Sequence, residues 1–304
     1  MIELKCKTCG GTIKFKQGET IGVCESCGTK MSLPRLDDEK LKTQFRKDKS
    51  VNEKVIERKN LKKIAAVVAS VICICIVFFV LLTNVIIPNL KHKSLCIRLN
   101  SVNVGDVVKF GKYEQDDNKS NGKEDIEWNV LAKESDRVLL ISKFALDSKQ
   151  YNSIWTDVTW KTCSLRQWLN NTFLNDAFSA EEQALIQDTY VSADANPKYD
   201  TKPGNATTDK VFLLSVNEAE MYFDSDESRK CIPTNYAKAN GAYTSSGKTK
   251  AGVPTCWWFL RSPGSNQVIA RVAYVDNYGS VDYYGGIADT DCNCVRPVMW
   301  VSFK

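Results

Sequence analysis

Histidine is almost absent from this chain of 304 residues, which contains a single one, His92. Because the region after residue 92 has no histidine, it cannot contain a catalytic triad of a nucleophile, a histidine and a carboxylate. A metal site with several histidine ligands is excluded for the same reason. No candidate catalytic residue stands out, so we do not expect an enzyme.

Lysine and glutamate are both missing from residues 251–303. Between Ser265 and Cys294, thirteen of thirty residues are instead Asn, Asp, Tyr or Ser, and they alternate with small apolar residues. This alternation predicts strands with one packed and one exposed face, with a hairpin turn at Asn277-Tyr-Gly279. Turns alone explain much of the Asn and Asp content. They do not explain four tyrosines, which are typical of binding surfaces.

The polar and aromatic side chains of residues 265–294 therefore form a predicted ligand face. The residues expected to contact the ligand are Asn266, Tyr274, Asp276, Asn277, Tyr278, Asp282, Tyr283, Tyr284, Asp289 and Asp291. Residues 289–293 begin like a calcium loop, but the Gly and the bidentate Glu of an EF-hand are missing. An alternative reading is an enzyme that uses Asp276 and Asp282 as paired carboxylates.

A run of 24 uncharged and mostly apolar residues extends from Ile64 to Ile87. At about 1.5 Å per residue, a helix of this length crosses a hydrocarbon core of about 30 Å. A cleavable signal peptide is shorter and stands at the extreme N-terminus, whereas 63 residues precede this run. We therefore predict one transmembrane helix over residues 64–87, and we expect Pro88 to end it.

Basic residues are unevenly distributed around the predicted span. Eight Lys/Arg fall in the twenty residues before it and three in the twenty after it. Because the more basic flank stays in the cytoplasm, we predict a cytoplasmic N-terminus and an external C-terminal region at the cell membrane. Residues 35–63 form a polar, basic stalk beside the bilayer, whose charges either touch anionic lipid or only fix the topology. Residues 88–101 are expected to form a linker.

Four cysteines near the N-terminus occur as two CxxC pairs, Cys6/Cys9 and Cys24/Cys27, each followed by glycine. Two such pairs can place four thiolates at the corners of a tetrahedron, which is the geometry of structural zinc. A reducing cytoplasm disfavours the alternative of two disulfides. We therefore predict a zinc ribbon over residues 1–34 with one structural Zn ion. Strands over 12–15 and 20–23 are expected to pair in a hairpin. The ribbon's cytoplasmic partner is unknown, and its lysines more often form a solvated surface than a nucleic-acid site.

Residues 102–304 are long enough for one packed domain, and their pattern is α+β. Capping boxes, in which Ser stands three residues before Gln or Glu, predict helices that begin after Ser164, Ser179 and Ser215. Alternating or apolar runs predict strands at 106–110, 126–133, 137–142 and 211–214. Six cysteines lie in this external region and its linker, and their spacing predicts no pairing.

Two segments near the C-terminus, residues 257–264 (WWFLRSPG) and 295–301 (VRPVMWV), resemble the signature of an uncharacterised domain family common in Firmicutes. Upstream segments fit the same pattern in the same order, so that the resemblance covers nearly all of residues 102–303. That family is similar to the C-type-lectin-like fold shared by formylglycine-generating enzymes and the target proteins of diversity-generating retroelements. The copper-binding cysteine motif of those enzymes is not matched by Cys292 and Cys294.

The resemblance implies a receptor-like role for the face at 265–294, and it implies that Trp258, Arg261 and Arg296 hold the fold. We therefore expect a multi-domain protein with a small β zinc ribbon, one transmembrane α-helix in the lipid bilayer, and an α+β C-type-lectin-like external domain. The expected function is a membrane-anchored surface binding protein that recognises an extracellular protein or glycan ligand. A cell-envelope enzyme and a membrane assembly scaffold are the alternatives.

Overall fold

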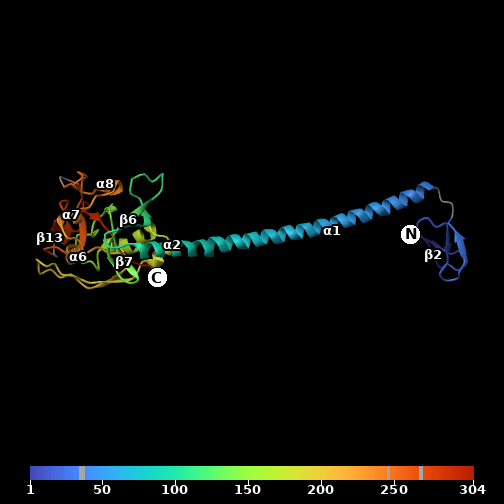
Figure 1. Ribbon diagram of the computed structural model, residues 1–304, viewed down its shortest axis with the longest axis horizontal. Coiled ribbons are helices and arrows are strands. Elements are labelled where there is room, and N and C mark those ends of the chain that lie inside the picture. Colours follow the sequence, from blue (N-terminus) through green and yellow to red (C-terminus); the bar gives the residue numbers. More distant parts are fainter. Residues whose placement is uncertain (34–37, 245–246, 267–269) are drawn as a thin grey trace. The chain divides into compact units, whose positions relative to one another are not determined.

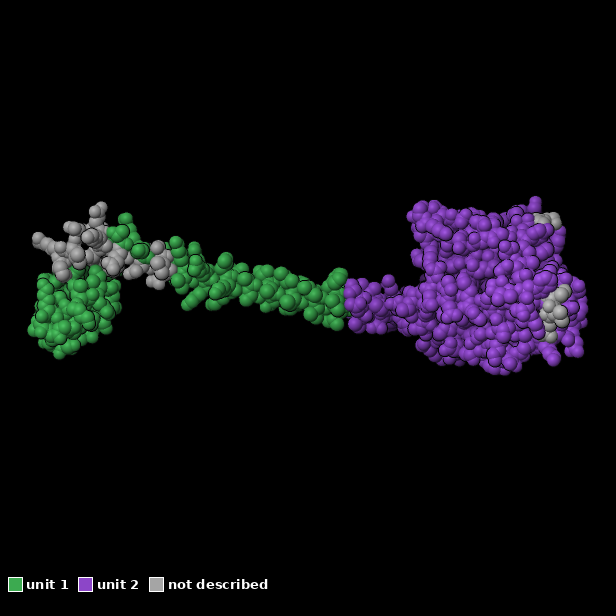
Figure 2. Space-filling model, turned by 180° about the vertical axis from the view of Figure 1, so that it is seen from behind, with its two compact units in different colours: residues 1–82 green, residues 83–304 purple. Residues whose placement is uncertain are grey.

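The structure, a computed structural model, describes residues 1–33, 38–244, 247–266 and 270–304. The chain divides into two compact units, Met1–Leu82 and Thr83–Lys304 (Figure 2). The first unit contains four short strands, β1 (Ile2–Lys5), β2 (Thr12–Phe15), β3 (Ile21–Val23) and β4 (Lys30–Ser32), followed by the long helix α1 (Figure 1). The second contains the remaining strands and helices, and each unit is described by itself.

The four N-terminal strands form two small antiparallel hairpins, β1–β2 and β3–β4. Each CxxC pair lies in the turn of one hairpin, where the amides of Gly10 and Gly28 donate to the carbonyls of Cys6 and Cys24, at 2.8 and 2.9 Å. The expected pairing of 12–15 with 20–23 is therefore wrong. In the described residues, an isolated bridge between Ile13 and Cys24 links the two hairpins. Each turn with a cysteine pair instead connects the strand directly before it to the strand directly after it.

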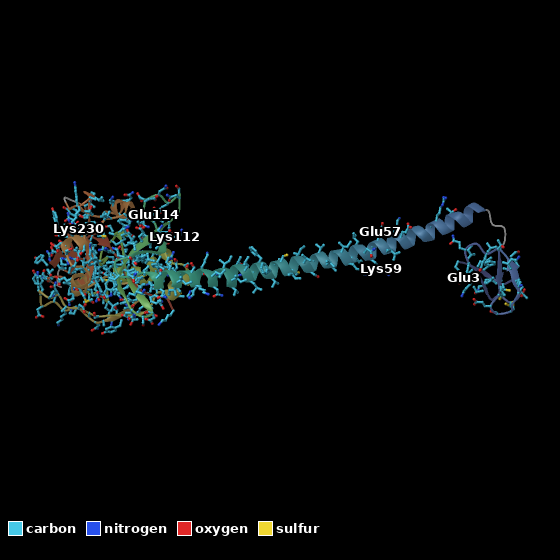
Figure 3. All side chains as sticks on the ribbon, in the orientation of Figure 1. Glu3, Glu57, Lys59, Lys112, Glu114 and Lys230 are labelled. Atoms are coloured by element: carbon cyan, nitrogen blue, oxygen red, sulfur yellow. The ribbon has the colours of Figure 1, made fainter. Side chains whose placement is uncertain are left out.

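Helix α1 extends over 44 residues, Asp38–Leu81. Its first half is polar, and the charged side chains of Glu57 and Lys59 are exposed to solvent (Figure 3). Its second half is the apolar run, whose side chains are exposed as well, Ile74 to 68%. Within the described residues, one helical stretch, Glu53–Ser101, is long and apolar enough to cross a membrane.

Pro88 does not end this helix, contrary to the expectation from the sequence. A π-helical turn, η1 (Leu82–Ile86), precedes it, and α2 (Ile87–Ser101) continues with Pro88 in its first turn. Proline lacks an amide hydrogen and its ring clashes with the carbonyl four residues earlier. A π turn widens the helix at one point and removes this conflict. Residues 88–101, the expected linker, therefore lie in α2, where Leu95 and Leu99 are buried.

The second unit is built on two sheets with the core between and around them. One sheet has the strand order β15-β7-β6-β5 and the other β13-β12-β11-β14-β8, and a separate pair is formed by β9 and β10. The strands are β5 (Val107–Tyr113), β6 (Glu124–Lys133), β7 (Arg137–Ser142), β8 (Asp147–Ser148), β9 (Thr189–Val191), β10 (Thr207–Asp209), β11 (Trp258–Pro263), β12 (Arg271–Val275), β13 (Val281–Ile287), β14 (Cys294–Val295) and β15 (Val298–Ser302). The three strands expected between 106 and 142 are thus confirmed as β5, β6 and β7.

Short helical segments connect the strands of the two sheets. They are α3 (Ser164–Trp168), the π turn η2 (Leu169–Phe173), α4 (Leu174–Ala177), α5 (Ala180–Leu185), α6 (Val216–Tyr222), α7 (Asp226–Arg229) and α8 (Asn235–Ala239). The capping boxes of Ser179 and Ser215 are confirmed. Residues 211–214 are buried as expected. The expected strand is absent from this segment, where Phe212 alone makes an isolated β-bridge, to Val298.

Candidate metal centre and candidate ligand face

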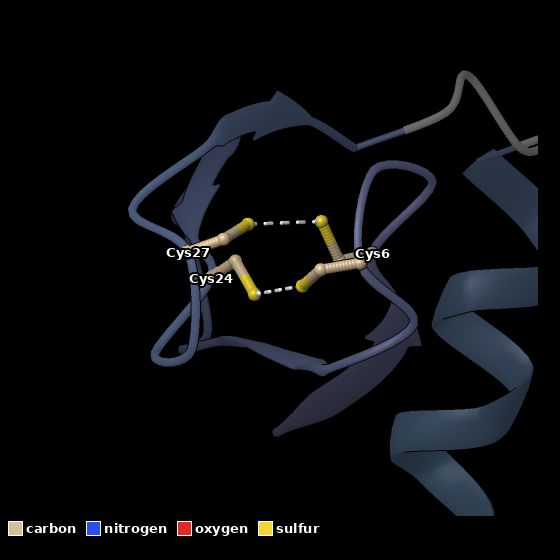
Figure 4. A group of neighbouring side chains, drawn as sticks. Cys6, Cys24 and Cys27 are labelled. Atoms are coloured by element: carbon tan, nitrogen blue, oxygen red, sulfur yellow. Dashed lines mark hydrogen bonds between the residues drawn. The ribbon is translucent and has the colours of Figure 1, made fainter.

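The four cysteines of the two N-terminal hairpins lie together, with all four sulfur atoms within 4.8 Å of one another. Cys6 Sγ is 3.6 Å from Cys27 Sγ, and Cys9 Sγ is 3.6 Å from Cys24 Sγ (Figure 4). Thiolates around a tetrahedral zinc ion, with Zn–S bonds of about 2.3 Å, stand about 3.8 Å apart. The cluster can therefore hold a metal ion.

Local backbone structure positions these sulfur atoms. Gly10 and Gly28 have positive φ angles of 76° and 69°, a conformation that glycine adopts without strain. The Cys27 sulfur lies 3.1 Å from the Thr29 hydroxyl. Hydrogen bonds from the hydroxyl and the amide of Thr29 lower the pKa of the Cys27 thiol to about 6. This cysteine is therefore prepared to act as a thiolate ligand.

The predicted hairpin turn of the ligand face is confirmed between β12 and β13. Asp276 organises it, because its Oδ1 accepts hydrogen bonds from the amides of Tyr278 and Ser280, at 2.8 and 2.9 Å. Gly279 has a φ of 90°. Asn277 is only 3% exposed and its side-chain oxygen accepts a hydrogen bond from Trp257 Nε1 at 3.0 Å. The expected exposure of Asn277 is therefore wrong, because the turn directs it inward.

Three aromatic rings follow one another across the surface next to this turn: Tyr243, Trp257 and Tyr274, hereafter the aromatic row. The ring centroids of Tyr243 and Trp257 are 4.4 Å apart, and those of Trp257 and Tyr274 are 5.2 Å apart. The Tyr274 hydroxyl donates to Asp282 Oδ2 at 3.0 Å. Burial and the charge of Asp282 raise the pKa of Tyr274 above its ordinary value, so the phenol stays protonated.

Sequence reasoning assigned Tyr274 and Asp282 to the ligand face but missed Trp257 and Tyr243. Tyr243 is 41% exposed, and its amide donates to the Cys292 carbonyl at 2.9 Å. It lies in a loop far from residues 265–294 in the sequence, so no local pattern connects it with them. Trp257 stands directly before the buried Trp258. Because successive side chains in an extended segment point to opposite faces, this pair could have indicated that Trp257 faces the surface.

The other predicted face residues belong to different surroundings. The Tyr283 hydroxyl donates to Glu220 and its ring lies under Lys198, whose Nζ is 3.5 Å from the centroid. Tyr284 packs against Tyr199 and Arg271, with centroid distances of 6.2 and 4.2 Å. The remaining residues lie at the turn or in loops. They are Tyr278 and Asn266, which are exposed, and Asp289 and Asp291 in the loop before β14.

The family model described as "Domain of unknown function (DUF6273)" matches residues 135–303. The chain belongs to this family. No curated protein and no solved structure matches the chain. The matched region begins just before β7 and ends with β15, so it contains both the aromatic row and the β12–β13 turn. Strands β5 and β6 precede it, although they complete the same sheet as β7 and β15.

Three residues of the DUF6273 region, Trp258, Arg261 and Arg296, are buried with exposures of 0, 4 and 2%. The Arg261 guanidinium makes ion pairs with Glu218 and Asp194. The Arg296 guanidinium lies between the rings of Phe223 and Trp258, with centroid distances of 5.1 and 5.0 Å. Their burial agrees with the expected role in holding the fold.

A pocket of about 550 Å³ lies beside the loop that contains Asp291. Trp168 and Tyr236 form its aromatic walls, and the Nζ of Lys149 lies over the Trp168 ring, 4.7 Å from its centroid. The charge of Lys149 is paired at 3.2 Å with the buried carboxylate of Asp147. The pocket therefore offers aromatic surface with a largely balanced charge, close to one end of the predicted ligand face.

Proposed function

We propose that this protein is a membrane-anchored binding protein that recognises a protein or glycan ligand. The binding part is the second unit, Thr83–Lys304, which contains the DUF6273 match and is hereafter called the DUF6273 unit. The observation that carries the proposal is the aromatic row, because three adjacent rings lie partly exposed, one of them, Tyr274, on strand β12. Rings of this kind supply large contact area at little cost in conformational entropy. They stack on the apolar face of a sugar or pack against a peptide, while Asp282 is positioned to orient polar groups.

Binding is favoured over catalysis by the surroundings of the two carboxylates. Asp276 holds the hairpin turn through two backbone amides, and Asp282 accepts from the Tyr274 hydroxyl. Both carboxylates thus already accept hydrogen bonds from groups that belong to the hairpin itself. We therefore interpret both as groups that shape the face.

The N-terminal unit is proposed to hold one structural zinc ion. Cys6, Cys9, Cys24 and Cys27 are four soft donors at the separation that zinc requires. Four thiolates fill a tetrahedral ion completely and leave no open position for a substrate. When bound, the ion contributes folding free energy and fixes the two hairpins against each other.

We further propose that the apolar stretch of α1 crosses the cell membrane with the zinc ribbon in the cytoplasm and the DUF6273 unit outside. The support is the excess of basic residues before the span. A C-type-lectin-like fold for the external unit stays part of this proposal, supported by the signature segments at 257–264 and 295–301 and by the α+β arrangement of the sheets.

The test is a screen of the full-length protein, held in a detergent without a sugar headgroup, against glycans and surface proteins. For any ligand found, Trp257→Ala and Tyr274→Ala should each weaken binding at least tenfold, as expected for central aromatic contacts. Tyr190→Ala is the matched control, because Tyr190 is 76% exposed on β9 and outside the aromatic row. Unchanged affinity in folded Trp257 and Tyr274 variants would show that the row is not the binding surface.

A further inference from the structure

The pocket of about 550 Å³ beside Asp291 shares no residue with the aromatic row. Its volume falls in the range of small-molecule sites, about 300–1,000 Å³. Trp168 and Tyr236 both line it, and each is partly exposed. Trp168 packs on Phe173 and Tyr236 on Tyr113, with centroid distances of 5.4 and 5.8 Å. Because both rings are held from behind, the pocket has aromatic walls in fixed positions.

Hydrogen bonds also fix the polar side of this pocket. Asn240 Nδ2 donates to Asp147 Oδ1 at 2.8 Å, and because a carboxylate only accepts, the amide oxygen of Asn240 is turned away from Asp147. The Ser148 hydroxyl donates to the Asp291 carbonyl at 2.6 Å, which holds the loop. Among the described residues, the Tyr236 hydroxyl, Asn240 Oδ1 and the Asp291 carboxylate have no hydrogen-bond partner. These three groups are available to a ligand.

The charges that line the pocket do not select an anion. Within the described residues, the lining contains one positive and one negative side chain, Lys149 and Asp291. Lys149 Nζ is 3.2 Å from the carboxylate of Asp147, whose side chain is 1% exposed, so the protein itself balances the lysine charge. Asp291 is exposed. A carboxylate and an amide oxygen beside aromatic walls favour a neutral ligand with several hydroxyl groups.

An exposed tryptophan stands beside the same pocket. Of the seven tryptophans in the chain, Trp155 is the one that is exposed, to 63%. It follows Ser153, which lines the pocket, by two residues, so their Cα atoms are at most about 7 Å apart. The loop is anchored, because the Asn152 side chain donates to the Ile154 carbonyl at 2.7 Å. An indole ring in water gains free energy when a ligand covers it.

We propose that this pocket, hereafter the sugar pocket, binds a neutral carbohydrate. A sugar combines an apolar face of C–H groups with hydroxyls that donate hydrogen bonds. The rings of Trp155, Trp168 and Tyr236 cover the apolar face. The Asp291 carboxylate and Asn240 Oδ1 accept from the hydroxyls, and the charge of Asp291 disfavours an acidic sugar. This site is additional to the aromatic row, and it depends neither on membrane anchoring nor on the orientation of the chain.

The experiment titrates the full-length protein, held in a detergent without a sugar headgroup, with glucose, galactose, N-acetylglucosamine and N-acetylgalactosamine. Saturation-transfer NMR detects each sugar and gives its dissociation constant. At least one of the four should bind saturably. Trp155→Ala and Asp291→Asn should each weaken this binding about tenfold, because one removes an aromatic contact and the other a charged acceptor. Both residues are exposed, so neither change should disturb folding.

Tyr190→Ala and Asp157→Asn are the matched controls, and both should keep the wild-type affinity. Tyr190 is an exposed aromatic residue on β9, Asp157 is an exposed carboxylate two residues after Trp155, and neither lines the pocket. Equal losses in controls and test variants would overturn the sugar pocket, as would the absence of saturable binding by all four sugars. Binding that survives both test substitutions would place the sugar elsewhere and would also refute the pocket.

These outcomes are separate from those for the aromatic row. The row is tested by Trp257→Ala and Tyr274→Ala with its own ligand, and neither residue lines the sugar pocket. A failure of the sugar pocket therefore leaves the result for the row unchanged, and the reverse holds as well.

Discussion

Arg261 and Arg296 are both buried in the DUF6273 region, but their charges are stabilised differently. Arg261 reaches two carboxylates and also donates to the backbone carbonyls of Ser192 and Leu213, at 3.2 and 2.9 Å. Arg296 lies between two aromatic rings and donates from Nε to the Ser142 carbonyl at 2.9 Å, while its Nη1 has no partner. Arg261 therefore links several elements, whereas Arg296 is held mainly by packing and cation–π contact.

The substitution Arg261→Gln should lower the free energy of unfolding by about 3–5 kcal/mol, because removing one partner of a buried ion pair leaves the other charges uncompensated. Urea unfolding followed by tryptophan fluorescence measures this change. The control is Lys109→Gln, which breaks a surface ion pair with Asp125 and should cost less than about 1 kcal/mol. Equal effects of the two substitutions would refute the role assigned to Arg261.

Burial of the signature residues was predictable from sequence, but the cap of α3 was not. Ser164 fits a capping box with Gln167, yet the cap is Cys163, whose sulfur accepts from the Arg166 amide at 3.4 Å. The Ser164 hydroxyl instead accepts from the Ser153 amide at 2.9 Å. This competing donor comes from a loop eleven residues away, and a local motif does not encode it.

At the scale of elements, the β12–β13 hairpin depends on the space around Gly279. A Cβ atom at this position would stand 1.7 Å from the Asp226 carbonyl oxygen, in addition to the strain of a φ of 90°. Gly279→Ala should therefore destabilise the protein by about 2 kcal/mol or more. Thermal unfolding of Gly279→Ala, compared with the wild-type protein, measures the effect.

Gly105→Ala separates strain from steric contact. Gly105 has nearly the same φ, 91°, but nothing lies within 4 Å of the added Cβ. Its substitution should cost only the conformational strain, about 1–2 kcal/mol. If Gly105→Ala proved as damaging as Gly279→Ala, the packing of α7 against the hairpin turn would not be the reason for the glycine.

Sequence patterns predicted the elements whose residues are close together and failed where distant residues decide the structure. The strands at 106–142, the caps at Ser179 and Ser215 and the turn at Asn277-Tyr-Gly279 follow from spacings of a few residues. The pairing of the N-terminal strands was wrong because each cysteine turn closes its own hairpin. The aromatic row was half predicted, because Tyr243 reaches it from a loop about thirty residues before Tyr274.

At the scale of the whole molecule, the two units have separate cores. Among the described residues, the N-terminal core contains four buried ones, Cys6, Ile13, Phe15 and Cys24, which is too few to stabilise a fold without a metal. A zinc chelator should therefore unfold the ribbon, since metal binding supplies on the order of 10 kcal/mol in such modules. Trypsin cleavage after Lys14, which lies in β2, reports this change.

The same chelation should leave unfolding of residues 83–304 unchanged, because that unit contains none of the four ligands. Cys24→Ser should reproduce the effect of the chelator. Cys75→Ser is the matched control, because Cys75 is exposed in the apolar run and outside the cluster. A ribbon that resists trypsin after metal removal would show that its hairpins fold without an ion.

The proposed orientation depends on the difference in charge between the two flanks of the apolar run. With an epitope tag at each end, protease added to intact cells should destroy the C-terminal tag and spare the N-terminal one until the cells are lysed. Replacing Arg58, Lys59, Lys62 and Lys63 with Gln leaves four basic residues before the run against three after it. This change should produce a mixture of orientations, because the bias in Lys/Arg largely determines which flank is retained.

The control for this experiment replaces Lys91 and Lys93 with Gln, which removes charge from the other flank and should keep the N-terminus protected. The two sets of substitutions act in opposite directions on one difference in charge. A C-terminal tag that is protected in intact wild-type cells would reverse the proposed arrangement. The aromatic row would then face the cytoplasm, and its ligand would have to be sought inside the cell.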